Sequence, residues 1–305
     1  MRDAFVKGLI EIAEKDDKVV LLMAEVGFGV VEPFEQRFPK RFFNTGISEQ
    51  SLALNAAGLA ISGFHPIAYS MSSFLPTRAF EMIKDSVCYQ DLPVVLVGIG
   101  SGISYGEMGS THHAIEESAL MRCLPNMTVI FPSDGDECIG ALKYAVSLQK
   151  PVYIGMEKVR AKATDAKKGF SPLWEKTGVG KDGAIISVGT MNETALKVRT
   201  ALSVDGIDFA VYRANVVKPL DYEAINDALR SKRLLILDEH VSIGGVGESI
   251  SAYILQSGQA TMLDYFKIIS IADEFPDVVY SMVDLLKRYN LTVDQIVKFI
   301  RDLMI

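Results

Sequence analysis

The chain has 305 residues, of which 49% are hydrophobic, and it carries a formal net charge of −7. This length and composition predict a globular protein with large apolar cores and two domains of ordinary size. The acidic balance supplies no general field that attracts nucleic acid or anionic lipid, so we expect small molecules or another protein as partners, and neither nucleic acid nor a membrane.

The first half of the chain alternates helical periodicity with short, continuous apolar runs. Parallel strands need crossover connections that cover both faces of the sheet, so this alternation predicts a parallel sheet with helices on both sides. The predicted helices cover residues 4–12, 49–62, 78–89, 115–122 and 136–148, and the predicted strands cover residues 19–24, 67–70, 94–99, 128–131 and 152–155.

The pattern breaks after residue 157 into a stretch rich in lysine and glycine, and then resumes. We interpret residues 159–180 as a linker between domains of residues 1–158 and 181–305. The second domain is predicted to have strands at 184–188, 208–217, 234–239 and 267–271, and helices at 192–205, 222–231 and 248–253. The predicted fold class is therefore α/β, with two α/β domains.

A strand-like stretch turns into an apolar helix at Gly46–Gln50, where Ser48 is the natural N-cap. Glu49 falls in the first helical turn, where the helix dipole favours a carboxylate, so a purely structural role is one explanation. The segment also resembles the G-I-x-E-Q signature of the pyrimidine-binding domain in transketolases and deoxyxylulose phosphate synthases. The resemblance implies that Glu49 is catalytic, because that glutamate hydrogen-bonds the aminopyrimidine ring of thiamine diphosphate and activates the cofactor.

Further cofactor contacts are implied by resemblance to the aromatic clamp of the same family, over Tyr69–Leu75 and Arg78–Glu81. Phe74 matches the ring that stacks on the aminopyrimidine, and Phe80 matches a supporting aromatic residue. Taken singly, either phenylalanine also suits an apolar core. Glu25 ends a predicted strand and matches an acidic position near the thiazolium ring; the carboxyl ends of strands are where open α/β sheets bind ligands.

A glycine-rich loop at Gly102–His113 is similar to the substrate loop of the family. His112 matches a histidine that lines the substrate channel, and its two ring nitrogens suit hydrogen bonding to sugar hydroxyls. We therefore expect His112 to be both catalytic and substrate-binding. A metal site of His112, His113 and a nearby glutamate is the rival interpretation. Adjacent histidines usually point apart and no further cluster completes a coordination sphere, so we expect no metal ligand in this chain.

The substrate side departs from the family pattern at two positions. Met108 stands where transketolases usually carry an aspartate that contacts an acceptor hydroxyl, and Gly100 stands where they carry a histidine near the donor. Arg2 and Lys158 match the positions of phosphate-binding arginines, with lysine acting as a point charge rather than a fork. We expect Met108, Arg2 and Lys158 to contact substrate, although Arg2 and Lys158 also suit a solvated surface.

The resemblance continues through the second domain, at Ile186–Thr190, Val217–Asp221 and Asp238–Gly247, which are similar to the C-terminal domain of transketolases. In that domain we interpret His240 as structural. Full-length members also carry a G-D-G motif that holds magnesium on the diphosphate, and this sequence has none. We therefore expect a separately encoded N-terminal transketolase subunit that holds the diphosphate and most of the Mg²⁺ contacts, with two copies of each chain in the assembly.

The activity implied by the resemblance is a thiamine diphosphate-dependent transketolase reaction, in which a two-carbon ketol unit passes from a ketose, expected to be a sugar phosphate, to an aldehyde. Two alternatives stay open: the beta subunit of a 2-oxoacid dehydrogenase-like enzyme, and a noncatalytic regulatory homologue. The Gly109–His112 segment argues against the dehydrogenase. Release of carbon dioxide from a 2-oxoacid would favour it, whereas aldehyde-dependent ketose formation would favour the transketolase.

The cysteines and the N-terminal residues indicate a cellular location. Cys88, Cys123 and Cys138 lack disulfide-framework or zinc-ligand spacing, so we interpret them as packed thiols in a reducing compartment. No apolar run approaches the ~20 residues that cross a bilayer, and no export signal is evident. We therefore expect a cytoplasmic protein.

Overall fold

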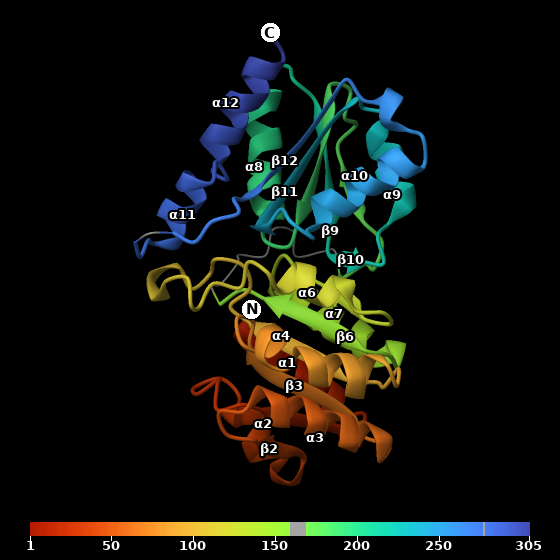
Figure 1. The fold of residues 1–305 in the computed structure, drawn as a ribbon, viewed down its shortest axis with the longest axis vertical. Helices are drawn as coiled ribbons and strands as arrows, with labels where there is room; N and C mark the ends of the chain where they lie inside the picture. The colour runs from red at the N-terminus through yellow and green to blue at the C-terminus, as the bar shows by residue number, and fades with distance from the viewer. Residues whose placement is uncertain (159–168, 277) are drawn as a thin grey trace.

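The computed structural model describes residues 1–158, 169–276 and 278–305, and these residues form two α/β domains, one above the other in Figure 1. This confirms the predicted fold class. The helices of the first domain are α1 (Arg2–Ala13), α2 (Glu32–Arg37), η1 (Pro39–Arg41), α3 (Glu49–Ile61), α4 (Leu75–Arg78), α5 (Phe80–Met82), η2 (Ile83–Cys88), η3 (Gly106–Met108), α6 (Glu117–Cys123) and α7 (Gly135–Leu148). Its strands are β1 (Val19–Met23), β2 (Phe42–Asn44), β3 (His65–Met71), β4 (Val95–Ile99), β5 (Thr128–Ile130) and β6 (Val152–Met156).

The second half of the chain supplies the remaining elements. Its strands are β7 (Glu175–Thr177), β8 (Gly183–Val188), β9 (Phe209–Ala214), β10 (Val216–Lys218), β11 (Arg233–Val241) and β12 (Tyr265–Ile271). Its helices are α8 (Met191–Ser203), α9 (Tyr222–Leu229), α10 (Val246–Gln256), η4 (Ala260–Met262), α11 (Met282–Arg288) and α12 (Val293–Leu303). None of the helices in the described ranges is long and apolar enough to span a membrane.

Within the described residues, the first sheet has the strand order β10-β5-β6-β4-β3-β1-β2 and the second has the order β12-β11-β8-β9-β7. Neighbouring strands run parallel except at β10–β5 and β7–β9. In the first sheet, alternate residues of β1 enter different cores: Val20 and Leu22 join one apolar cluster, whereas Leu21 and Met23 join another with α1 and α7. The continuous apolar runs of the sequence thus reflect strands covered on both faces.

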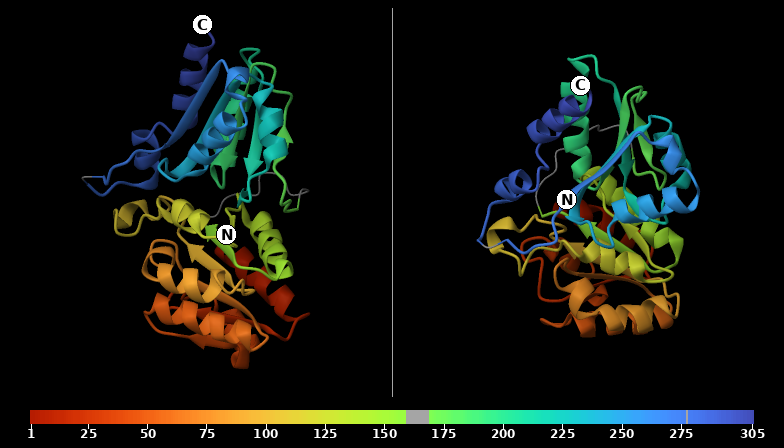
Figure 2. Two further views of the ribbon diagram at one scale, coloured as in Figure 1. Left: turned by 45° about the vertical axis from the view of Figure 1, so that its right-hand side comes forward. Right: turned by 45° about the horizontal axis from the view of Figure 1, so that its top comes forward.

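The two domains share packing as well as chain connectivity. They lie next to each other in both views of Figure 2. One apolar cluster contains Leu52 of α3 and Met121 of α6 from the first domain, together with Ile186 and Leu234 from the second. A third cluster, around α8 and α12, covers the other face of the second sheet. The contact between domains is therefore part of the apolar core.

The prediction of one continuous strand at residues 208–217 is wrong, because the structure has two strands there. It divides at Asn215 into β9, which belongs to the second sheet, and β10, which pairs antiparallel with β5 of the first sheet. Asn215 is buried at the division, where its carbonyl accepts from the Phe131 amide at 2.8 Å and its side-chain oxygen accepts from Ser133 at 3.1 Å. These local bonds satisfy the backbone where the chain changes sheets.

The predicted helix at residues 78–89 also differs from the structure. Short helices α4 and α5 are followed by η2, a π-helical turn. The wider turn places Ile83, Val87 and Cys88 in the core, which regular α-helical spacing would not achieve equally for all three. The elements α2, β2, α11 and α12 were not predicted from the sequence.

Part of the predicted linker lies outside the described residues, namely 159–168. Of the remainder, Glu175–Thr177 forms β7, which pairs with β9 at the edge of the second sheet. The domain limits at residues 158 and 181 stay a prediction.

Candidate functional site

Glu49 lies at the first residue of α3, buried to 4% exposure. The chain reaches it through Gly46, whose φ of +68° is a left-handed conformation that suits glycine, and Ser48 caps the helix by accepting from the Ser51 amide. Ser70 donates to Glu49 Oε1 at 3.3 Å, and Arg78 donates to Oε2 at 3.2 Å. The predicted N-cap is confirmed, and the carboxylate is fixed by the helix terminus and by two side chains.

Arg78 links Phe74 to this carboxylate, because its guanidinium group contacts both side chains. The Arg78 guanidinium carbon lies 4.0 Å from the centre of the Phe74 ring, and the Phe74 and His112 ring centres are 5.5 Å apart. The structure thus brings Glu49, Phe74 and His112, which are distant in sequence, into one group. Arg78 joins them, and sequence reasoning assigned it no role. Its position four residues after Phe74, within one helical turn, was a partial signal, but its contact with Glu49 depends on how α4 packs against α3.

Phe80 lies outside this group of contacts. Its half-buried side chain packs against the apolar cluster that contains Leu52 and Ile83. This packing accounts for the side chain without a ligand, and its support of a cofactor ring stays a prediction.

Three of the four residues expected to contact substrate come together in one cavity of about 390 Å³, and the fourth, His112, is not among the residues that line it. Arg2, Met108 and Lys158 line it together with Tyr105, and Met282 adds a side chain from the second domain. The Lys158 ammonium lies 4.7 Å from the centre of the Tyr105 ring, whose centre is 6.4 Å from that of His112. Tyr105 therefore connects this cavity to the group around Glu49.

Glu25 occupies the carboxyl end of β1 with a φ of 47°, and it is exposed. Asn44, at the end of the neighbouring strand β2, donates to Glu25 Oε2 at 2.7 Å and accepts from the Glu25 amide at 3.3 Å. The two hydrogen bonds orient this exposed pair at the edge where α/β sheets bind ligands. Asn44 was not singled out from the sequence.

The two adjacent histidines have different surroundings. His112 is half-buried, and its Nδ1 lies 3.0 Å from the Thr111 hydroxyl. His113 is buried with Nε2 3.3 Å from the Gly106 carbonyl oxygen, and burial lowers its pKa. Within the described ranges, no group of three or more His, Cys, Asp or Glu residues could hold a metal ion.

A buried ionic network lies where α6 meets β11. His240 stands between Asp238 and Glu117, with its Nδ1 2.7 Å from Asp238 and its Nε2 3.2 Å from Glu117. Burial alone would lower the pKa of His240, but the two carboxylates outweigh it and raise that pKa to about 10. Glu117 also accepts from Ser101 and Tyr153 of the first domain. His240 thus joins the two domains, as a structural role requires.

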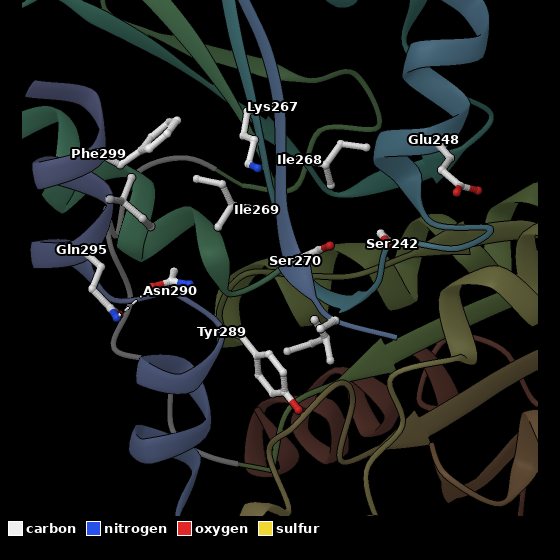
Figure 3. Close-up of a pocket in the computed structure, with 13 residues that line it drawn as sticks. Ser242, Glu248, Lys267, Ile268, Ile269, Ser270, Tyr289, Asn290, Gln295 and Phe299 are labelled. Carbon is white, nitrogen blue, oxygen red and sulfur yellow. Dashed lines mark hydrogen bonds between the residues drawn. The ribbon is translucent and has the colours of Figure 1, made fainter. Parts of the chain in front are cut away.

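A larger cavity, of about 580 Å³, lies in the second domain between β12 and the start of α12 (Figure 3). Lys267, Tyr289 and Gln295 line it, and none of the residues predicted for the site does. The carboxylate, aromatic and histidine contacts described above instead place the candidate site at the first domain.

Comparisons with known proteins identify the family of both domains. Residues 1–162 match the family model "transketolase, pyrimidine binding domain", and residues 174–296 match "transketolase, C-terminal domain". Two relatives, each 33% identical, are the 1-deoxy-D-xylulose-5-phosphate synthases of Desulforudis audaxviator and Clostridium acetobutylicum. Both matches cover 97% of this chain, which spans about half the length of these relatives, 47% and 48%.

Solved structures give the same result. A protein described as a split gene transketolase, inactive beta4 tetramer, is 31% identical, with a TM-score of 0.86 and with 99% of this chain and 96% of that chain covered. Transketolase from Campylobacter jejuni shares the fold at 17% identity, with a TM-score of 0.80 and coverage of 99% and 46%. The chain therefore belongs to the transketolase family, and it carries the pyrimidine-binding and C-terminal domains of that family.

Proposed function

We propose that this chain is the C-terminal subunit of a split, thiamine diphosphate-dependent transketolase that transfers a two-carbon ketol unit from a ketose, such as a sugar phosphate, to an aldehyde. The observation that carries the proposal is the convergence of Glu49, Phe74 and His112 on one site, next to a cavity lined by Arg2 and Lys158. The near-complete match to a split gene transketolase supports it.

The residues present fit the aminopyrimidine end of thiamine diphosphate. Both Glu49 contacts, at 3.2 and 3.3 Å, are longer than strong charge-assisted hydrogen bonds, so the carboxylate can accept from a further donor. The buried Ser73 hydroxyl has no hydrogen-bond partner within the described part of the chain. Phe74 offers a half-buried aromatic ring for stacking. The same residues offer no acidic cluster for Mg²⁺, which we assign to the partner subunit.

When bound, thiamine diphosphate supplies the carbon nucleophile for attack on the ketose carbonyl. Glu49 would hydrogen-bond the pyrimidine nitrogen and set the protonation state of the ring, while Phe74 would fix the ring plane. His112 would donate to or accept from substrate hydroxyls. Arg2 and Lys158 would hold a terminal phosphate in the cavity beside Tyr105 and Met108. Glu25 would lie toward the thiazolium ring.

The proposed assembly contains a separate subunit that binds the diphosphate, and two copies of each chain. Apolar side chains are exposed along α3, the helix that begins at Glu49: Ile47 precedes it, while Leu54 and Ile61 lie seven residues apart along one face of it. Their exposures are 78%, 47% and 64%. Exposed apolar surface of this kind suits a subunit contact, and the related split enzyme is named as a tetramer of one chain type.

The proposed location is the cytoplasm. The cysteines Cys88, Cys123 and Cys138 form no disulfide, and Cys88 and Cys138 are buried. Thiols in this state suit a reducing compartment.

A second candidate is favoured by the relatives named 1-deoxy-D-xylulose-5-phosphate synthase. That name specifies a product without a hydroxyl at C1, so such an enzyme must transfer a two-carbon fragment that ends in a methyl group. Met108, half exposed in the substrate cavity, presents a thioether where transketolases usually carry an aspartate that binds an acceptor hydroxyl. The residue at this position is therefore compatible with both candidate activities.

The test uses the chain reconstituted with a diphosphate-binding partner, thiamine diphosphate and Mg²⁺. Aldehyde-dependent formation of a new ketose from a ketose donor supports the transketolase. Release of carbon dioxide from a 2-oxoacid, with a 1-deoxy sugar phosphate as product, would favour the synthase, and oxidation of the 2-oxoacid fragment would favour the dehydrogenase. An unchanged rate after Glu49→Ala would indicate a noncatalytic homologue.

A further inference from the structure

Two glutamate side chains meet in the contact between the domains. Glu157 follows β6 in the first domain and is 5% exposed, while Glu239 lies in β11 of the second domain and is 3% exposed. Both carboxyl groups reach the hydroxyl of Thr190, which precedes α8. Buried carboxyl groups are rare unless they are paired with a cation or neutralised by a proton.

The hydrogen-bond geometry requires a proton at this place. Thr190 Oγ1 is within hydrogen-bond distance of Glu157 Oε1 and 2.7 Å from Glu239 Oε1. A hydroxyl has one hydrogen to donate, and an ionised carboxylate can only accept. One of the two contacts must therefore be donated by a carboxylic acid. Glu239 Oε2 is buried with no partner among the described residues, as expected for a neutral acid rather than an anion.

The charges around the pair act in both directions, and burial decides the outcome. The Met1 amino group favours ionisation of Glu157, and His240 favours ionisation of Glu239. Glu193 of α8 opposes ionisation of Glu157, and the two carboxyl groups oppose each other. Burial is the largest influence on both, and the pKa of each is raised, that of Glu239 well above its ordinary value of 4.5.

The pair lies directly beneath the substrate side of the candidate site. A Cβ atom at Gly102, which begins the loop of Met108 and His112, would stand 2.7 Å from Glu239 Cγ. Glu157 immediately precedes Lys158, which lines the substrate cavity. A change in the spacing of the two carboxyl groups would therefore shift both the loop that begins at Gly102 and the backbone at Lys158.

We propose that Glu157 and Glu239 hold one proton between them and, with Thr190, form a proton-dependent latch that joins the two domains beneath the substrate loop. Loss of the proton leaves two buried anions in contact, which weakens the latch. The proposal is independent of the proposed function, since it needs neither cofactor nor substrate.

The direction of the pH dependence follows from the raised pKa of both groups. Their stabilising contribution is fully present below the ordinary value of 4.5 and is lost progressively as the pH rises from that value through the raised value of the folded state. Glu239→Gln reduces this loss, because a neutral amide can donate a hydrogen bond in place of the acid at every pH and cannot become a second buried anion.

The first experiment compares thermal unfolding of the full chain and its variants. Between about pH 6 and about pH 9, we expect the Tm of the original chain to fall by at least about 3 °C relative to Glu239→Gln. Glu223→Gln is the matched control: it changes an exposed carboxyl group in the first turn of α9, and its curve should stay parallel to that of the original chain. Parallel curves for Glu239→Gln as well would overturn the proposal.

A second measurement does not depend on how well the variants fold. Infrared spectroscopy of the original chain at neutral pH should show the carbonyl stretch of a neutral, buried carboxylic acid, and the band should vanish at high pH. Glu239→Gln or Glu157→Gln should also remove it. Absence of the band from the original chain at neutral pH would contradict the shared proton, whatever the variants do.

Discussion

At the scale of single residues, the site depends on how Glu49 is held. The carboxylate lies at a helix N-terminus, where the dipole favours its charge, and it is buried with polar contacts from Ser70 and Arg78. The ion pair with Arg78 is worth little for stability, because the arginine side chain is 49% exposed and solvent screens it. A change of charge at Glu49 should therefore affect chemistry more than folding.

Glu49→Gln in the reconstituted complex should lower kcat by about 100-fold or more, because an amide cannot hold the pyrimidine nitrogen in the required protonation state. The rate is measured under saturating substrate, with Tm measured in parallel. Glu223→Gln is the matched control, since Glu223 is an exposed first-turn glutamate of α9. Equal rates for the two variants would remove Glu49 from the mechanism.

The sequence predicted the residues of the site better than their arrangement. Ser48 follows from local rules for helix caps, whereas Glu49, Phe74 and His112 were assigned to the site by their resemblance to family motifs. The bridging position of Arg78 depends on how α4 packs against α3, which no local pattern records. Asn44 beside Glu25 likewise depends on the pairing of β1 with β2, and β2 was not predicted at all.

At the scale of elements, one departure from local pattern lies at the joint between the domains, where β10 pairs with β5 of the first sheet. Lys218, in β10, donates to the carbonyls of Arg122 and Leu124 at the end of α6, where backbone acceptors lack helical partners. Burial lowers the pKa of Lys218, but the group retains these two bonds. Strand β10 thus holds the C-terminal end of α6, the helix whose first residue is Glu117 of the buried ionic network.

Replacement of this lysine tests that contact. Lys218→Met should lower the free energy of unfolding by about 1–3 kcal/mol, because it leaves two carbonyls without their charged donor. Lys176→Met removes a partly exposed ion pair with Asp227 and should cost less than about 1 kcal/mol. Urea unfolding of both variants measures the difference. An equal loss of unfolding free energy would show that the Lys218 contact stabilises the fold no more than an exposed ion pair does.

The substrate loop offers a second test at this scale. Gly102→Ala introduces a left-handed alanine and a Cβ 2.7 Å from Glu239 Cγ, whereas Gly63→Ala has a similar backbone conformation and no atom within 4 Å. Both should lose about 1–2 kcal/mol through the backbone, and Gly102→Ala about 1–3 kcal/mol more through overpacking. Unfolding free energies that match would argue against close packing between the loop and β11.

At the scale of the whole molecule, the two α/β domains were predictable because parallel strands covered on both faces leave continuous apolar runs. The run at Val19–Met23 is an example, with all five residues buried. The exchange of β10 into the first sheet was not predictable, because Val216 and Val217 are as apolar as the strand before them and only tertiary pairing with β5 separates them. The π-helical turn of η2 is likewise set by packing against α3.

In the proposed enzyme, this chain supplies the pyrimidine-binding half of a cofactor site that another subunit completes. Calorimetry of thiamine diphosphate with Mg²⁺, on this chain alone and on its mixture with a candidate diphosphate-binding subunit, tests this division of the site. We predict saturable binding only in the mixture, and its marked weakening by Phe74→Ala. Tight binding by this chain alone would contradict the claim.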